Sequence, residues 1–397
     1  KVFQKETLQP TWYEQKLWHL YDCTDWAANL AQLPTVAYSG EIDSQKQAAD
    51  MMAAALKKEG IELTHLIGPG TAHSYHPTTK LEVDRRIDSI MSLGRERLPR
   101  SLRFVTYTLR YNRMHWVTVD AIKEHWSLAR VNAAIVADNF VEIGTSNVEQ
   151  LTLSMPAGYC PLPIDSPVQI KIDEQSVEAP RPGSDLSWEV TLHRAGDQWK
   201  LGPLPMDGLR KRHGLQGPID DAFLDSFVFV RPTGKAQHSL VEKWVQSELS
   251  HAIVHWRQQF RGQARVLDDT AVTDEHIANS NLILWGDPTS NAVLKKIADK
   301  LPIHWDDREI IVGDDKFPAD RHAAIAIAPN PLNPNRYVVL NSSFTFREYD
   351  YLNNARQVPK LPDWAIVDLR TPPNSRFPGK VADAGFFDEQ WQVMSER

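Results

Sequence analysis

An aspartate and a histidine that could act together in acyl transfer follow two consecutive predicted strands near the start of the chain. Asp43 comes after the apolar run Thr35–Tyr38, and His73, 30 residues further along, comes after the run Leu63–Ile67. Residues that follow the strands of a parallel α/β sheet lie at one edge, and this separation accommodates a crossover helix. A carboxylate beside an imidazole orients the ring and stabilises its protonated form during general-base catalysis. The sequence therefore predicts that Asp43 and His73 lie side by side as catalytic residues.

The elements that would position this pair alternate between strand and helix. Ser44–Lys58 predicts an amphipathic helix with Ser44 as its N-cap and Gly60 at its C-terminal stop. The expected buried stripe of this helix consists of Ala48, Met51, Met52, Ala55 and Leu56. Residues 79–93 predict a second helix, and residues 1–34 predict a helical, aromatic-rich segment. This alternation indicates a parallel α/β sheet.

The third member of a catalytic triad is missing from the sequence. In α/β hydrolases the serine precedes the acid and the histidine, and it lies in a Gly-x-Ser-x-Gly turn. No such motif occurs in the chain, Ser39 and Ser44 flank Asp43 itself, and Ser74 directly follows His73. The nucleophile is therefore expected upstream of Lys1, and the chain as given is expected to be inactive.

The residues around the pair resemble a known family. Val36–Asp43, followed by Gln47–Ala49, a predicted helix and Gly68–Pro77, is similar to the end of the catalytic domain of prolyl oligopeptidase-type serine peptidases, which belong to the α/β-hydrolase superfamily. Upstream, Leu20–Ala27 is similar to the segment before the acid-bearing strand in bacterial members.

This resemblance covers residues 1–94 and implies a role for each residue of the pair. Asp43 and His73 match the acid and the histidine of the family's triad, and His76 is expected to be a loop residue. Residues 95–397 resemble the long C-terminal extensions of some bacterial members. The family's nucleophile elbow, oxyanion-hole loop and first strands are absent from this sequence.

The pattern changes after the charged, proline-bearing segment Arg95–Arg100. Residues 103–200 contain short alternating runs separated by turn residues, without a long helix, which indicates a β-sandwich-like domain. From about residue 206, buried runs alternate with helical stretches, which indicates a second α/β domain with a doubly wound sheet and an irregular C-terminal tail. The expected fold class is therefore α/β, with three domains: 1–94, the C-terminal half of an α/β-hydrolase sheet; 95–205, the β-sandwich-like domain; and 206–397, the second α/β domain.

Composition restricts the possible partners. Of the 397 residues, 42% are hydrophobic, which is enough for packed cores, and the net charge of −7 without a basic cluster argues against nucleic-acid binding. No run of about 18 apolar residues occurs, so no transmembrane helix is expected. Lys1–Glu6 lacks the apolar region of a signal peptide, and the sequence gives no basis for a localisation or an oligomeric state. Two cysteines, Cys23 and Cys160, cannot build a disulfide framework or a four-cysteine zinc site.

Other motifs give weaker signals. His251 and His255 have the spacing of zinc ligands on a helix but lack the adjacent glutamate of H-E-x-x-H. Asp306-Asp307 and Asp314-Asp315 do not fit an EF-hand loop, and Gly68-Pro69-Gly70 is no dinucleotide fingerprint. No metal and no cofactor is therefore expected. The 13 tryptophans could line a sugar-binding face of the β domain, but their patterns favour core packing.

The leading hypothesis is the C-terminal part of a serine peptidase. His73 would deprotonate the absent serine and then protonate the leaving amine, while Asp43 would hold His73 in the correct tautomer. The expected substrate is a peptide or an ester. Two alternatives remain: an esterase on the same fold, since fold and triad do not select the acyl donor, and a non-catalytic binding or scaffolding protein built on the β and second α/β domains.

Overall fold

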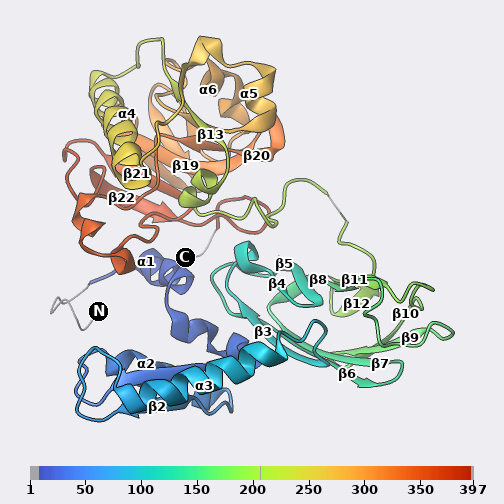
Figure 1. Ribbon diagram of the computed structural model, residues 1–397. Helices are drawn as coiled ribbons and strands as arrows, with labels where there is room; N and C mark the ends of the chain where they lie inside the picture. The colour runs from blue at the N-terminus through green and yellow to red at the C-terminus, as the bar shows by residue number, and fades with distance from the viewer. Residues whose placement is uncertain (1–8, 206, 395–397) are drawn as a thin grey trace. The chain divides into compact units, whose positions relative to one another are not determined.

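A computed structural model describes residues 9–205 and 207–394 of the chain. The described residues form two compact units (Figure 1). One unit combines the residues up to Tyr21 with those that follow Pro205, and the other consists of Asp22–Pro205. Both units contain several sheets, so the protein is a mixed α/β structure, in agreement with the expected class. Within these residues, no helix combines the length and apolar character needed to cross a membrane.

In the second unit, the two predicted strands that precede Asp43 and His73 are present. β1 (Val36–Gly40) and β2 (Thr64–Gly68) pair in parallel, with Val36 opposite Thr64 and Gly40 opposite Gly68. They alternate with α2 (Lys46–Lys58) and α3 (Pro77–Leu93), which lie beside them in Figure 1. The prediction of neighbouring parallel strands linked by a crossover helix is confirmed.

Two expectations for α2 are wrong. Ser44 does not cap the helix, because α2 begins at Lys46 and Gln45 occupies its N-cap position; the Asp43 carboxylate accepts from the Gln45 backbone N–H at 2.8 Å in the turn before the helix. Of the expected apolar stripe only Leu56 is buried, and Met51 is 54% exposed. The sheet against which α2 packs has only two strands, and Ala48 and Met51 of the stripe are exposed while Met52 and Ala55 are partly buried.

The segment 1–34 is not one helix. Its described part contains the short α1 (Trp12–Leu17), followed by two stretches of 3₁₀-helix, Trp18–Leu20 and Cys23–Gln32. The chain leaves one compact unit and enters the other between Tyr21 and Asp22, and Asp22 adopts an extended conformation that separates the two stretches. Residues 1–8, where part of the helical segment was expected, lie outside the described residues.

Residues 95–205 form a two-sheet β structure. Its strands are β3 (Ser101–Thr106), β4 (Arg113–Met114), β5 (Val117–Ile122), β6 (Ala129–Ala137), β7 (Phe140–Ser146), β8 (Val148–Met155), β9 (Val168–Ile172), β10 (Gln175–Ala179), β11 (Trp188–Ala195) and β12 (Gln198–Leu201). One sheet has the order β10-β9-β7-β6-β3 and the other β12-β11-β8-β5-β4. Neighbours pair antiparallel except β7 and β9.

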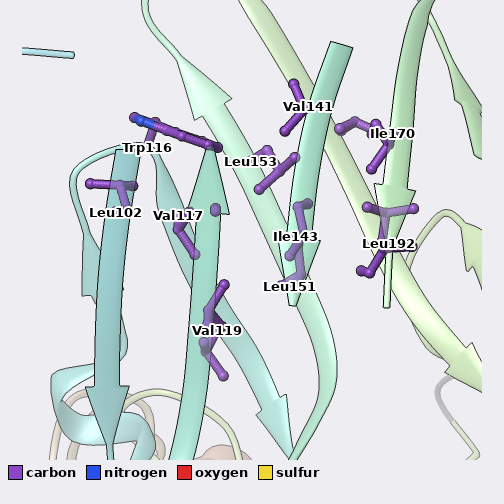
Figure 2. Packing of buried hydrophobic residues seen from close by; sticks show 14 of the residues in the cluster. Leu102, Trp116, Val117, Val119, Val141, Ile143, Leu151, Leu153, Ile170 and Leu192 are labelled. Carbon is purple, nitrogen blue, oxygen red and sulfur yellow. The ribbon is translucent and has the colours of Figure 1, made fainter. Parts of the chain in front are cut away.

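The side chains between these two sheets form a single core. Figure 2 shows Ile143 and Val141 of one sheet packed near Leu151 and Leu153 of the other, and all four are buried. Burial of this apolar surface stabilises the fold by about 25 cal/mol per Å². The four tryptophans of this region, Trp116, Trp126, Trp188 and Trp199, are also buried, so they do not line an exposed sugar-binding face.

The β structure and the β1–β2 segment belong to one compact unit. Asn29 exchanges two hydrogen bonds with the Val105 backbone, at 3.0 and 2.8 Å. Arg130 forms a bidentate ion pair with Glu59 at 2.8 and 2.9 Å. A bidentate arginine–carboxylate pair fixes orientation as well as distance. These contacts explain why residues 22–94 group with residues 95–205.

The other unit contains a seven-stranded sheet in the order β14-β13-β15-β20-β19-β21-β22. Its elements are β13 (Phe227–Arg231), α4 (Ser239–Phe260), β14 (Val266–Asp268), α5 (Asp274–Asn279), β15 (Asn281–Leu284), α6 (Ala292–Ile297), β19 (His322–Asn330), β20 (Asn333–Leu340), β21 (Trp364–Asp368) and β22 (Lys380–Gly385). A separate small sheet contains β16 (His304–Trp305), β17 (Glu309–Val312) and β18 (Asp315–Pro318).

This large sheet is mixed: the sequence predicts a second α/β domain with a doubly wound sheet, and part of the sheet is parallel and part is antiparallel. β14, β13, β15 and β20 pair in parallel, whereas β19 is antiparallel to both β20 and β21. Only Pro331 and Leu332 separate β19 from β20. A connection of two residues forms a hairpin, because a parallel neighbour requires a crossover of a dozen or more residues.

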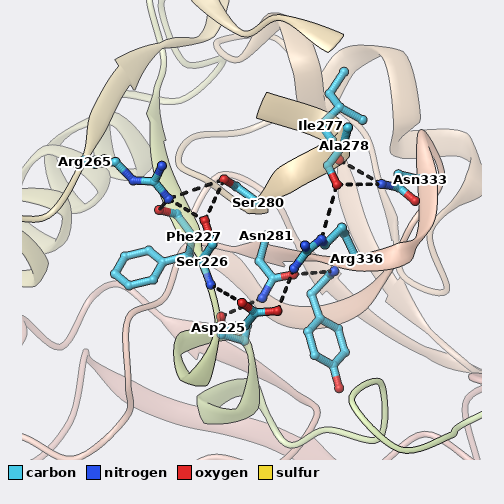
Figure 3. Close-up of polar contacts among 12 residues, drawn as sticks. Asp225, Ser226, Phe227, Arg265, Ile277, Ala278, Ser280, Asn281, Asn333 and Arg336 are labelled. Carbon is cyan, nitrogen blue, oxygen red and sulfur yellow. Dashed lines mark hydrogen bonds and ion pairs between the residues drawn. The ribbon is translucent and has the colours of Figure 1, made fainter. Parts of the chain in front are cut away.

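A polar network holds the amino ends of the parallel strands. In Figure 3, Arg265 donates to the Phe227 carbonyl at 2.9 Å and to the Ser226 hydroxyl at 2.7 Å, and Ser226 contacts Ser280 at 3.0 Å. Asn281 at the start of β15 accepts from the backbone N–H of Tyr337 in β20 at 2.9 Å. Each of these polar groups has a partner, so this edge of the sheet is a structural one.

Candidate functional site

Asp43 and His73 are in direct contact, as their positions in the sequence predict. His73 Nδ1 lies 3.0 Å from Asp43 Oδ2. The Asp43 side chain is 9% exposed, whereas the His73 side chain is 73% exposed. The carboxylate is therefore enclosed and the imidazole faces solvent. This arrangement leaves one edge of the ring accessible to a third group.

Gly40 allows this contact because it lets two loops approach closely. A Cβ atom at Gly40 would lie 2.1 Å from the Ala72 carbonyl oxygen and 2.3 Å from that of Thr71. The Ile42 backbone N–H then donates to the Thr71 carbonyl at 3.1 Å. Only a residue without a Cβ permits this approach. The end of β1 and the histidine loop are thereby held against each other.

The Tyr38 hydroxyl fixes the loop that carries the histidine. It accepts from the His76 backbone N–H at 2.8 Å and donates to the Ser74 carbonyl at 3.0 Å. At the start of the loop, the Gly70 backbone N–H donates to the Glu41 carboxylate at 2.7 Å. Three residues of the loop are therefore bonded to β1 or its extension. His76 takes part through its backbone, as the last residue before α3.

The Asp43 carboxylate is stabilised in its ionised form. The Gln45 backbone N–H, which donates at 2.8 Å, and then the His73 ring lower the pKa of Asp43 below its usual range. A charged acceptor beside Nδ1 assigns the proton to Nδ1 and the lone pair to Nε2. Within the described residues, His73 Nε2 makes no hydrogen bond. Chemically, the pair can accept a proton at His73 Nε2 and stabilise the resulting imidazolium.

A serine–histidine contact that the sequence pattern did not indicate joins β1 and β2. Ser39 Oγ lies 2.9 Å from His65 Nε2, and His65 Nδ1 lies 3.9 Å from Asp50 Oδ1. The order resembles a triad, but 3.9 Å is too long for a hydrogen bond and Ser39 is only 6% exposed. A substrate carbonyl cannot reach a hydroxyl buried there. The signal in the sequence was that Ser39 directly follows one predicted strand and His65 lies in the next. The pairing of these strands brings the two side chains close together.

The weaker motifs have structural partners. His251 Nε2 pairs with Glu348 at 2.7 Å, and His255 is buried among aromatic rings. Asp306 accepts the backbone N–H groups of Arg308 and Glu309, at 2.8 and 2.9 Å, in a tight turn. Among residues 9–205 and 207–394, no three or more His, Cys, Asp or Glu side chains are arranged to hold a metal ion.

Comparison of the chain with protein-family models, with curated proteins and with solved structures finds no match. Among the described residues, the Asp43–His73 pair combines a defined chemical capacity with an accessible reacting atom, His73 Nε2.

Proposed function

We propose that Asp43 and His73 are the acid and the base of a serine-type acyl transfer in a prolyl oligopeptidase-type peptidase, of which this chain is the C-terminal part. The single observation that carries the proposal is the 3.0 Å contact between an enclosed carboxylate and an exposed imidazole at the ends of adjacent parallel strands. Reactive groups of open α/β sheets lie at this edge.

In the proposed reaction, His73 Nε2 takes the proton of a serine hydroxyl as its oxygen attacks the carbonyl carbon of the substrate. Asp43 keeps the ring in the required tautomer and stabilises the imidazolium that forms. His73 then transfers the proton to the leaving amine, which leaves an acyl-enzyme for water to hydrolyse. The serine would come from a Gly-x-Ser-x-Gly elbow that the given sequence does not contain.

The incomplete burial of β1 and β2 supports a larger parent sheet. Parallel strands are normally covered on both faces, yet most residues of these two strands are only partly buried, and Ile67 is exposed. Met51 of α2 and Met91 of α3 are also exposed. These apolar surfaces are what an α/β-hydrolase sheet would present where further strands and helices are missing.

The test uses the parent chain extended upstream through its elbow. A fluorophosphonate probe is expected to label the new serine, and His73→Ala is expected to slow that labelling by several orders of magnitude because no base activates the hydroxyl. His304→Ala is the matched control, since His304 is an exposed histidine in the small β16–β18 sheet. Unchanged labelling of the His73→Ala enzyme would remove His73 from the reaction.

The chain as given provides a second test. Because it lacks the nucleophile, it is expected to show no labelling and no hydrolysis above background. Robust labelling of the 397-residue chain would identify a different serine and contradict the proposal. In the extended enzyme, the ratio of kcat/KM for a peptide amide to that for the corresponding ester distinguishes a peptidase from an esterase.

A further inference from the structure

A cavity of about 340 Å³ lies in the unit that contains the seven-stranded sheet. It is beside α4 and beyond the carboxyl ends of β13 and β15. The chain passes from β13 through α4 to β14 on one side, and then returns past β13 to β15 on the other side. Ligands of open α/β sheets bind where the strand order reverses in this way. The cavity volume lies within the range of small-molecule sites.

The loops that form one end of the cavity are held rigidly together. The buried Asp287 carboxylate accepts from the Gln237 backbone N–H at 2.9 Å and from that of Ser290 at 2.8 Å. A Cβ atom at Gly234 would lie 2.9 Å from the Ser290 carbonyl oxygen, so this close approach requires a glycine. The end of the cavity is therefore preformed and does not depend on a ligand for its shape.

The helix side of the cavity carries an unusual row of polar groups. Glu242, Gln246 and Ser250 are spaced by four residues, so they lie along one side of α4. In the part of the chain that the structure describes, none of these three side chains makes a hydrogen bond or an ion pair. The apolar lining consists of Pro232, Ala236, Val245, Leu249, Ile253 and Val266.

The charge of the cavity is set by Glu242. Arg231 also lines it, but its guanidinium pairs with Asp268 at 2.6 Å. Glu242 is thus a carboxylate without a compensating cation among the described residues. At the amino ends of the parallel strands of the same sheet, by contrast, Arg336 pairs with Asp225 at 2.6 Å within the network of Figure 3.

We propose that this cavity binds a small amphipathic amine. The ammonium group would pair with Glu242, while Gln246 and Ser250 would exchange hydrogen bonds with neighbouring polar groups of the ligand. The apolar part of the ligand would lie against Val245, Leu249 and Ile253. A ligand ammonium group gains more binding free energy beside the unpaired Glu242 carboxylate than a ligand carboxylate would gain beside Arg231, because Arg231 is already paired with Asp268. This site is independent of the proposed peptidase function.

The test titrates the 397-residue chain with phenethylamine by isothermal calorimetry at low salt, with 3-phenylpropionate as the carboxylate of similar shape. Phenethylamine is expected to bind at least about tenfold more tightly than 3-phenylpropionate. A charged hydrogen bond between its ammonium group and the partly enclosed Glu242 carboxylate contributes a binding free energy of this size. Glu242→Gln is expected to remove that preference. Glu275→Gln, an exposed glutamate in α5, is the matched control and should change nothing.

A second variant separates loss of binding from loss of folding. Ser250 is exposed at the rim, so Ser250→Trp should fill the cavity without disturbing the core, and it should abolish phenethylamine binding while the circular dichroism spectrum stays unchanged. The proposal is overturned if phenethylamine does not bind, if it binds equally well to Glu242→Gln and Ser250→Trp, or if 3-phenylpropionate binds as tightly.

Discussion

At the scale of single residues, Asp43 is the member of the candidate pair whose environment is most restrictive. Its carboxylate accepts from both the Gln45 backbone and the His73 ring, and both hydrogen bonds favour its ionised form. A neutral amide at this position would present an N–H group to His73 Nδ1 and stabilise the opposite tautomer. The lone pair that should lie on Nε2 would then be lost.

This gives the first prediction. Asp43→Asn in the extended enzyme is expected to reduce kcat on a chromogenic peptide amide by about 10⁴-fold, as the same change does in other triads. Asp50→Asn serves as the control, because Asp50 is half exposed and lies 3.9 Å from His65, beyond hydrogen-bond range. A decrease of less than tenfold for Asp43→Asn would show that the carboxylate does not orient the base.

His255 supports a second prediction, about pH. The side chain is 1% exposed, neither ring nitrogen has a hydrogen-bond partner among the described residues, and Phe344 lies 4.4 Å from its ring centroid. Burial, followed by the neighbouring His251, lowers the pKa of His255 to about 4. The unfolded chain, with an ordinary pKa near 6.5, therefore binds the proton first as the pH falls.

Folding stability is thus expected to decrease between about pH 6.5 and pH 4 because of His255. At pH 5 the loss corresponds to about 2 kcal/mol relative to pH 7.5. His255→Phe keeps an aromatic ring in the cluster and removes the titration, so urea unfolding of this variant should depend less on pH over the same interval. An equal pH dependence in both proteins would contradict this account.

At the scale of elements, the contact between the end of β1 and the histidine loop depends on Gly40. Gly40→Ala would place a methyl group 2.1 Å from the Ala72 carbonyl oxygen, so the loop must move. A displacement of about 1 Å at a catalytic base can reduce the rate by about 10²-fold. We expect a loss of this size in kcat of the extended enzyme, together with a lower melting temperature.

The control for this third prediction is Gly144→Ala. A Cβ atom at Gly144 in β7 has no neighbour within 4 Å, and its backbone conformation suits an alanine. Melting temperature and kcat of this variant should therefore match those of the unmodified enzyme. If Gly40→Ala behaved in the same way, the close approach of the two segments would have no functional consequence.

The sequence predicted the positions of the main strands and helices better than their surroundings. The runs Thr35–Tyr38 and Leu63–Ile67 indicated strands because apolar and β-branched residues cluster there, and β1 and β2 lie at these positions. An apolar stripe on α2 did not reveal what covers it, since amphipathicity records only that one face is apolar. The direction of β19 was not predicted either. A fully buried strand has the same continuous apolar sequence pattern whether its neighbours run parallel or antiparallel to it.

At the scale of the whole molecule, two cores are expected to unfold separately. Leu153 is fully buried in the β structure and Ile283 is fully buried in the seven-stranded sheet, and they belong to different compact units. Calorimetry should show two transitions. Leu153→Ala should lower one and Ile283→Ala the other, each by about 2–5 kcal/mol of unfolding free energy. A single transition shifted by both substitutions would contradict this prediction.

The two candidate sites differ in how far the sequence could predict them. Asp43 and His73 were predictable because each lies in the loop that follows a strand, and adjacent parallel strands bring these loops together. The cavity beside α4 was not, because its lining comes from Arg231–Ala236, Glu242–Ile253, Val266 and Gly286–Ser290, which only the folded sheet assembles. No local spacing joins residues of four separate segments.

The two-residue connection between β19 and β20 has a consequence for the order of folding. These strands can pair as soon as both are available, whereas β13 must wait for β15 across the whole of α4, β14 and α5. Contacts that are local in sequence close at a lower entropic cost and form earlier. The hairpin would then provide the template on which β15 and β13 assemble in turn. Pulse-labelled hydrogen exchange during refolding should protect the amides of Ala328 and Val338, which lie opposite each other in the hairpin, before that of Val230 in β13; the reverse order would place the nucleus in the parallel half of the sheet.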